Sequence, residues 1–249
     1  MQTRATDKMF EARWVPSMLV WPYPLDILLA MTAPSVLSDL APTGRLRAGI
    51  NYSNFVLATK DPASGEPAGI APDLARRIAQ RLNVPIQFVT FETAGKMADA
   101  VRTGAWDIAF LANEPERANE IQFTPPYLEI EAGYLVPPGS RIQSIKEVDR
   151  PETRIAIATK SAYDLFLSRN LQHATLIRAQ GMPASYELFI VDKLDVLAGI
   201  KPWLSKVVEK LPGSRMLDGH FMTVQQCIGT PRGREAGARF LAEFVRENV

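Results

Sequence analysis

The alternation of short apolar runs with amphipathic helical runs is the feature that most constrains the fold of this chain. Residues 46–50 and 86–91 have the composition of strands, and the segment 73–82 between them carries Leu74 and Ile78 on one helical face. Strands that alternate with helices are typical of α/β architecture, because two parallel strands need a crossover connection between them. The sequence therefore predicts an α/β fold built mainly on parallel strands.

The same order recurs in the second half of the chain. The runs 154–158 and 195–200 predict strands, and each is followed by a segment with a helical pattern, 162–170 and 203–211. Because both halves use strands and helices in this order, we interpret the chain as two lobes that are built on one scheme.

Two extended apolar runs, 133–136 and 221–225, bracket the second unit, and we interpret them as paired hinge strands between the lobes. After the second crossing, the helix predicted over 234–249 returns the chain to the first lobe. Successive strand residues point to opposite faces, so at most one of Gln225 and Gln226 faces the space between the lobes. The predicted division is lobe one, residues 41–134 plus 222–249, and lobe two, residues 135–221.

Residues 1–40 are expected to form a leader or a poorly ordered N-terminal segment. The apolar run 19–30 is broken by Pro22 and Pro24, and it is shorter than the roughly 20 residues that a membrane span needs. It is also atypical as the apolar centre of a secretory signal. Met31 is an alternative start of the protein.

Composition and charge argue against several classes of function. The 28 Lys and Arg residues nearly balance the 27 Asp and Glu residues, and no basic stripe predicts binding to nucleic acid. Cys227 is the one cysteine, so no internal disulfide is possible. His173 and His220 lack metal-ligand spacing, and no phosphate-binding loop or nucleophile motif is present. We therefore expect a monomer without metal, cofactor or catalytic residues.

Residues 105–127, AWDIAFLANEPERANEIQFTPPY, hold the most informative motif. A predicted strand at 108–112 runs into a short polar loop that carries Arg117, and a second strand at 121–124 leads to Pro-Pro-Tyr. A guanidinium held between two strand ends suits a small carboxylate, because its planar fork can give two parallel hydrogen bonds. The alternative is a surface arginine that pairs with a neighbouring glutamate.

The order of helix, Gly-x-x-Asp-apolar strand, Pro-Glu-Arg, strand and Pro-Tyr resembles the family-3 extracellular solute-binding proteins, the amino-acid receptors of ABC importers. The resemblance runs in order from about Leu46 to about Val245. It implies a two-lobed periplasmic-binding-protein-like clamshell, in which each lobe is a mixed, mainly parallel sheet flanked by helices. It also implies a small-molecule carboxylate ligand, ABC permease subunits as partners, and a periplasmic location, although the atypical N-terminus leaves the cytoplasm open.

The resemblance places the ligand in the cleft, where the carboxyl ends of the strands meet. It implies that Arg117 holds the ligand carboxylate and that Tyr52 or Phe55 packs on the ligand side chain. The helix that starts after Ser161 offers free backbone amides to the same carboxylate, although Ser161 also suits a helix cap. The predicted ligand-binding residues are Asn51, Tyr52, Phe55, Ala112, Asn113, Glu114, Arg117, Lys160, Ser161, Ala162, Tyr163, Ile200 and Lys201.

One position departs from the pattern of the family. The family motif Asp-Ala-Val-x-x-Asp-x-Pro places an aspartate that binds the α-ammonium of the ligand where this chain has Ile200. Loss of such a charge-assisted bond costs roughly 1.5–3 kcal/mol. Either Glu114 replaces this group from the other lobe, or the ligand is not a standard α-amino acid. Lys201, if it faces the cleft, favours a second acidic group on the ligand.

Two other functions remain open on the same fold. Some proteins that resemble this family are dehydratases of cyclohexadienyl compounds such as arogenate, and that chemistry needs a general acid. Glu114 is the candidate for that role. The other alternative is a ligand-sensing module that reports to a signalling protein.

Overall fold

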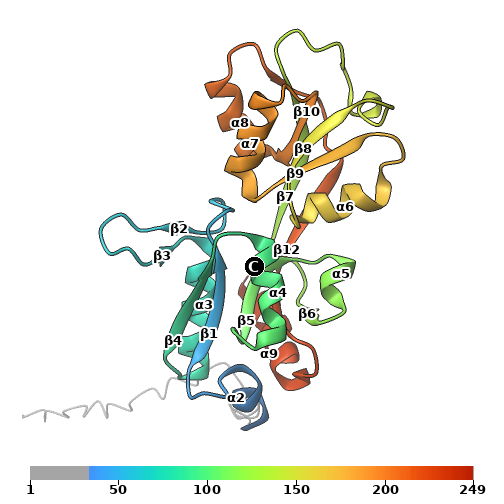
Figure 1. Ribbon diagram of the computed structural model, residues 1–249. Helices are drawn as coiled ribbons and strands as arrows, with labels where there is room; N and C mark the ends of the chain where they lie inside the picture. The colour runs from blue at the N-terminus through green and yellow to red at the C-terminus, as the bar shows by residue number, and fades with distance from the viewer. Residues whose placement is uncertain (1–33, 249) are drawn as a thin grey trace, which may run out of the picture.

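The computed structural model describes residues 34–248, which form two lobes joined by two long strands (Figure 1). One ten-stranded sheet runs through both lobes in the order β4-β1-β5-β12-β7-β10-β8-β9, with β6 beside β12 and β11 beside β7. The elements are α2 (Pro34–Leu40), β1 (Leu46–Asn51), β2 (Thr59–Lys60), β3 (Pro67–Ala68), α3 (Ile70–Leu82), β4 (Ile86–Phe91), α4 (Ala94–Asp99), η1 (Ala100–Thr103), β5 (Ile108–Ala112), α5 (Pro115–Ala118), β6 (Ile121–Phe123), β7 (Leu128–Val136), η2 (Ile145–Glu147), β8 (Arg154–Ala158), α6 (Ala162–Asn170), β9 (Thr175–Ala179), α7 (Gly181–Val191), β10 (Val196–Ile200), α8 (Lys201–Lys210), β11 (Arg215–Met216), β12 (Met222–Pro231) and α9 (Glu235–Asn248).

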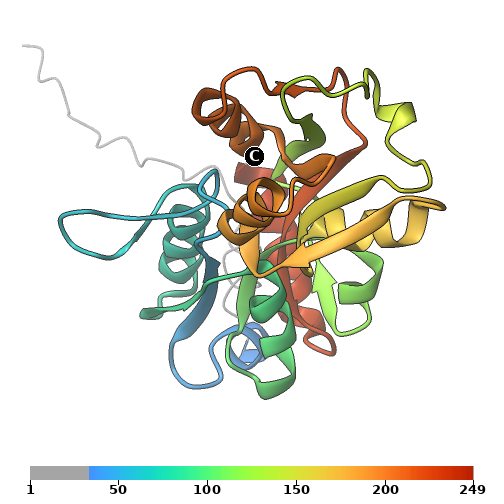
Figure 2. The same cartoon turned by 45° about the horizontal axis from the view of Figure 1, so that its top comes forward.

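In lobe one, β1 pairs in parallel with β4 and β5, as the alternating pattern predicted. Helix α3 buries its apolar residues, Leu74 and Ile78 among them, against the core. This helix begins before the predicted start at Asp73, because Gly69 adopts φ 111° and turns the chain into it. The hairpin of β2 and β3 projects from the side of the lobe in both views (Figures 1 and 2).

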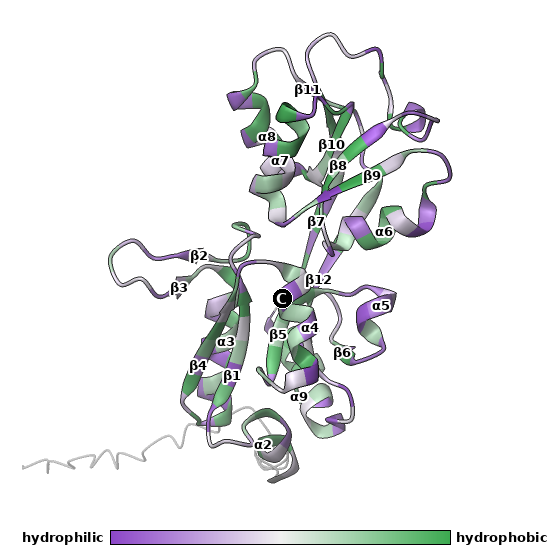
Figure 3. Cartoon of the chain, in the orientation of Figure 1, coloured by the Kyte–Doolittle hydropathy of each residue, from purple (hydrophilic) through white to green (hydrophobic). Residues whose placement is uncertain are grey.

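In lobe two, β8 pairs in parallel with β9 and β10, and helices α6, α7 and α8 flank these strands. The residues of β10 are all buried, as are those of β5 in lobe one. Figure 3 shows apolar strands in the middle of each lobe, with polar residues on the helices and loops around them. The predicted α/β class and two-lobed architecture are therefore both observed.

The crossing between the lobes pairs a different part of the first strand from the predicted one. In the structure, β12 pairs antiparallel with the first part of β7, so that Met222 faces Ala132 and Gln226 faces Leu128. The residues after Ala132, which were predicted to pair with β12, lie beyond the end of β12 and pair with β10 on the opposite edge of β7. Beyond the shared segment β7 continues into lobe two, where β11 occupies its other edge, and β12 continues beside β5 in lobe one.

The N-terminal boundary also differs from the prediction. Helix α2 falls inside the segment expected to be a leader, yet it packs on α9, and Val36 and Leu40 are buried in the core. The Asp39 carboxylate accepts a hydrogen bond from the Gly237 amide at 2.9 Å. The described part of lobe one therefore includes α2, and the remainder of the expected leader, residues 1–33, lies outside the described residues. In the described part of the chain, no helix is both long and apolar enough to cross a membrane.

Candidate functional site

A cavity of about 60 Å³ lies between the lobes, where the ends of strands from both lobes meet. Asn51 ends β1 and Ala112 ends β5 on one side, and Ala158 ends β8 and Ile200 ends β10 on the other. These are the carboxyl ends of the strands, which is where open α/β sheets bind their ligands. The fold therefore gathers the expected segments around one space between the lobes.

The structure divides the predicted site residues into two groups. Those that line the cavity are Asn51, Ala112, Arg117, Ser161, Ala162, Tyr163 and Ile200. Those that do not line it are Tyr52, Phe55, Asn113, Glu114, Lys160 and Lys201.

Arg117 is buried at the wall of the cavity, with 7% of its surface exposed. Its Nη1 donates to the Ala112 carbonyl at 3.0 Å in lobe one, and its Nη2 donates to the Lys160 carbonyl at 2.9 Å in lobe two. Among the described residues, no carboxylate lies within ion-pair distance of this guanidinium, so the alternative of a surface pair with a glutamate is wrong. Arg117 is thus a buried cation whose protein partners are neutral carbonyls.

Burial lowers the pKa of Arg117 to about 10, although the more distant carboxylates of Glu114, Glu116 and Asp99 act in the opposite direction. The guanidinium is therefore still charged at neutral pH. Removal from water is unfavourable for a charge that has no ionic partner. A bound anion would supply that partner.

Helix α6 begins at the lobe-two wall of the cavity, and Ala162 and Tyr163 of its first turn line it. Ser161 is the helix cap, since its hydroxyl oxygen accepts from the Asp164 amide at 3.0 Å. The Asp164 carboxylate accepts from the Lys160 amide at 2.7 Å and pairs with Arg178. Ser161 thus has the structural role of a cap as well as a position at the cavity wall.

Glu114 is buried but directed away from the cavity. Its carboxylate pairs with Arg169 of α6 at 2.8 Å, and the same arginine also pairs with Glu116. Burial raises the pKa of Glu114, while the hydrogen bond and charge of Arg169 oppose that rise. Neither the predicted role as partner of an ammonium group nor that of general acid fits this position.

Lys160 and Lys201, which were predicted to bind the ligand, likewise form ion pairs outside the cavity. Lys160 pairs with Asp99 of α4 at 2.6 Å, across the gap between the lobes. Lys201 pairs with Glu131 of β7 at 2.6 Å. A second cation for an acidic ligand is therefore absent from the wall of the cavity formed by residues 34–248.

The three remaining predicted residues lie beside the cavity. Phe55 holds the Lys206 ammonium of α8 at 3.6 Å from its ring centroid, which is a contact between the lobes. Tyr52 is partly buried and packs against the core of the protein, and the Asn113 side chain is exposed. The local sequence identified aromatic residues near the cleft but could not show which way each side chain points.

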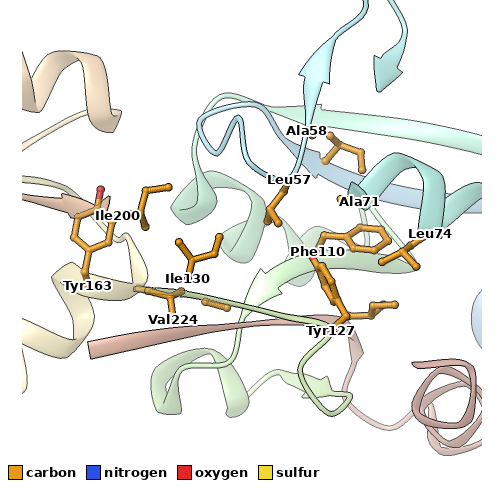
Figure 4. Close-up of a cluster of buried hydrophobic side chains, with 14 of the residues drawn as sticks. Leu57, Ala58, Ala71, Leu74, Phe110, Tyr127, Ile130, Tyr163, Ile200 and Val224 are labelled. Atoms are coloured by element: carbon orange, nitrogen blue, oxygen red, sulfur yellow. The ribbon is translucent and has the colours of Figure 1, made fainter. Parts of the chain in front are cut away.

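The apolar wall combines residues that the sequence had not indicated with the predicted Tyr163 and Ile200. Leu57 and Phe110 lie on one side, and Tyr163 and Ile200 lie on the other (Figure 4). Met182 of α7 completes this wall. Phe110 belongs to a strand whose residues are all buried, so strand periodicity alone marks it as core.

Several polar lining residues were also missed, among them Thr93 and Asn54. The alternation of side chains along a strand had predicted that at most one of Gln225 and Gln226 faces the cleft. Gln226 lines the cavity, whereas the Gln225 amide donates to Glu129 at 3.1 Å on the exposed side. No group of three or more His, Cys, Asp or Glu residues in the described chain could hold a metal ion.

Comparisons with known proteins agree with this geometry. The family model for bacterial extracellular solute-binding proteins, family 3, matches residues 46–246. The structure is similar to that of the holo ArgBP from T. maritima, with a TM-score of 0.71 and 19% sequence identity over 84% of this chain and 92% of the other. It is also similar to AncCDT-1, described as an ancestral amino acid-binding protein and a precursor of cyclohexadienyl dehydratase, with a TM-score of 0.69 and 20% identity over 85% of this chain and 92% of the other. At these identities the structural likeness establishes the fold alone.

One curated relative is the membrane-bound lytic murein transglycosylase F of Shewanella sp. (strain W3-18-1), which is 25% identical over 130 residues. The match covers 51% of this chain but 26% of the transglycosylase, so the chain spans about a quarter of that relative's length.

Proposed function

Because the chain belongs to the bacterial extracellular solute-binding proteins, family 3, we propose that it is the substrate-binding component of an ABC importer in the periplasm. Its ligand is a small solute that bears a carboxylate, either an amino acid or a related organic acid. The observation that carries this proposal is Arg117, a buried cation at the wall of the cavity between the lobes.

Arg117 can bind a carboxylate without giving up its present contacts. A guanidinium has five N–H donors, and two hydrogen bonds go to the carbonyls of Ala112 and Lys160. The remaining donors can serve a ligand carboxylate, and charge-assisted bonds of this kind are stronger than neutral ones. Because one carbonyl belongs to each lobe, the guanidinium reaches this geometry only when the lobes are close together.

Contacts around the cavity hold the lobes in this closed arrangement. Arg169 of lobe two pairs with Glu114 of lobe one, and Lys160 of lobe two pairs with Asp99 of lobe one. A ligand that touches both walls adds to these contacts only in the closed form, so its binding shifts the population of the protein towards closure. In the proposed function the permease distinguishes the closed form from the open one.

The cavity is less suited to a dehydratase than to a binding protein. Among the described residues that line it there is no aspartate, glutamate or histidine, and Glu114 is paired with Arg169 outside it. A general acid must reach the proton acceptor directly or through one water molecule. Turnover of arogenate or prephenate by the purified protein would contradict this part of the proposal.

The test is a thermal-shift screen against carboxylates, followed by calorimetry on Arg117→Gln. A ligand at about 100 times its Kd should stabilise the wild type by roughly 2.7 kcal/mol. Arg117→Gln should weaken binding by roughly 1.5–3 kcal/mol, because a charge-assisted bond is lost.

Arg102→Gln is the matched control, since Arg102 is exposed and pairs with Glu120 outside the cavity. Unchanged affinity in Arg117→Gln would show that the carboxylate is held elsewhere. Ligand-dependent import by a reconstituted permease would separate transport from a sensing role, and cell fractionation would test the periplasmic location.

A further inference from the structure

The charge at the wall of the cavity is unbalanced. Arg117 is the one charged side chain among the described residues that line it. The acidic groups nearby are held elsewhere, since Glu114 pairs with Arg169 and Asp99 pairs with Lys160. The cavity therefore offers a partner for a ligand anion and none of opposite sign for a ligand cation.

Two polar side chains of the lining, Asn51 and Thr93, show the same bias towards donors. The Asn51 side-chain oxygen already accepts from the Ser53 amide at 3.0 Å and from the Ser53 hydroxyl at 2.8 Å. The Thr93 hydroxyl oxygen accepts from the Lys96 amide at 3.2 Å. In contrast, the Asn51 amide hydrogens and the Thr93 hydroxyl hydrogen donate no hydrogen bond within the described residues. Free donors suit the oxygens of an acid, whereas an ammonium group needs free acceptors.

Gln226 is a neutral side chain of the lining that can bind a polar substituent of the ligand. It is 5% exposed, it lines the cavity, and its side-chain amide makes no hydrogen bond within the described residues. A carboxamide both donates and accepts, so it can donate to a keto oxygen or accept from a hydroxyl group. It carries no charge with which to neutralise an ammonium group.

The lobe-two wall adds a penalty for a ligand cation. Ile200, 4% exposed, ends β10 at the cavity, and Tyr163 and Met182 share this wall. Burial raises the pKa of the Tyr163 phenol, so that side chain stays neutral. An ammonium group against this surface would lose its water without gaining a carboxylate, which is unfavourable.

We propose that this cavity selects a small organic acid that has no amino group over the α-amino acid with the same carbon skeleton. The inference rests on the proposed function, because it names the class of solute that the same site takes. A hydroxyl or keto group in place of the α-ammonium lets Arg117 neutralise the carboxylate and lets Gln226 bind the substituent. Ile200 is the residue that decides between the two classes.

The experiment is calorimetric titration of the full chain with matched pairs: lactate and alanine, 2-hydroxyisovalerate and valine, phenyllactate and phenylalanine. Acetate, propionate and succinate complete the set as acids without an α-substituent. The wild type is expected to bind an amine-free acid at least tenfold more tightly than the matching or nearest amino acid, which corresponds to about 1.4 kcal/mol. Ile200→Asp places a carboxylate at this wall and is expected to reverse the preference, while Ile200→Asn, which has the same shape without the charge, is not.

Equal or tighter binding of the amino acid by the wild type would overturn the inference and leave the proposed function standing. No binding of any of these acids or amino acids would contradict both. The comparison within the wild type decides the matter even if Ile200→Asp does not fold. If Ile200→Asp folds and leaves the preference unchanged, Ile200 is not the residue that excludes the amine.

Discussion

The cavity between the lobes and the rim around it use charge in opposite ways. On the rim, Glu114 and Glu116 of lobe one share Arg169 of lobe two, so each charge has a partner. At the cavity wall, the partners of Arg117 among the described residues are two carbonyl groups. The paired charges of the rim favour closure whatever the ligand, and the unpaired charge inside makes a bound anion favourable. Residues that are neighbours in the sequence thus serve closure and binding separately.

The largest effect is expected from removing the shared cation of the rim. Arg169→Ala leaves the buried Glu114 carboxylate without its partner, and loss of one member of such a pair typically costs several kcal/mol. Because Arg169 is itself 34% exposed, we expect a decrease of roughly 2–4 kcal/mol in the free energy of unfolding, measured with urea. The double variant Arg169→Ala with Glu114→Gln should recover part of this loss. Equal stability of the single variant and the wild type would show that the rim pair does not hold the lobes together.

A change at Gly95 separates closure from folding. This glycine of α4 faces lobe two, and an added Cβ would lie 2.6 Å from the Cβ of Lys160. Gly95→Ala should therefore impede closure and weaken ligand binding by roughly 1–3 kcal/mol, the usual range for overpacking. The fold of lobe one should be unharmed, because alanine is favoured over glycine in a helix.

The measurement for Gly95→Ala is ligand affinity by calorimetry beside urea unfolding without ligand. Gly104 lies in the left-handed region with φ 62° and has no neighbour within 4 Å of an added Cβ, so Gly104→Ala strains the backbone without obstructing closure. This control should lower stability and leave affinity unchanged. A loss of stability without a loss of affinity in Gly95→Ala would contradict the closed arrangement.

The smallest expected effect is that Glu114 and Glu116, the two glutamates of the rim, contribute to the free energy of unfolding with opposite pH dependence. Burial raises the pKa of Glu114, so its favourable contribution to folding is present at low pH and is lost as the pH rises through its folded pKa. Burial also acts to raise the pKa of Glu116, but bonding to Arg169 and to backbone lowers it overall. Its contribution is present above the unfolded pKa and is lost as the pH falls through the folded pKa.

We therefore compare the free energy of unfolding of each variant with that of the wild type. As the pH rises from 4 to 7, Glu114→Gln should become more stable relative to the wild type, whereas Glu116→Gln should become less stable. Urea unfolding of the two variants at both pH values checks this. The same direction of change in both variants would remove the distinction between the buried and the exposed partner of Arg169.

The sequence by itself determined the elements whose signals are local. The bounds predicted for β4, β5, β8 and α6 match the structure, because apolar runs, helical periodicity and the Ser161 cap act within a few residues of the chain. The two-lobed class also followed from the order of strands and helices, since crossovers between parallel strands admit few topologies. Arg117 was singled out because it stands between two predicted strand ends, and the resemblance to the family implied its place at the cleft.

The tertiary structure decided what depends on contacts between distant segments. The pairing of β12 with only the first part of β7 depends on β11, which takes the same edge of β7 from Leu135 onward. The outward direction of Glu114 follows from Arg169, which approaches only when the lobes meet. Gln226, rather than Gln225, faces the cavity because of the way β12 is oriented in the folded protein. The period-two alternation of a strand places the two residues on opposite faces, but it does not show which face is turned to the cavity. Local periodicity specifies each element, but the space between the lobes exists only after the chain has folded.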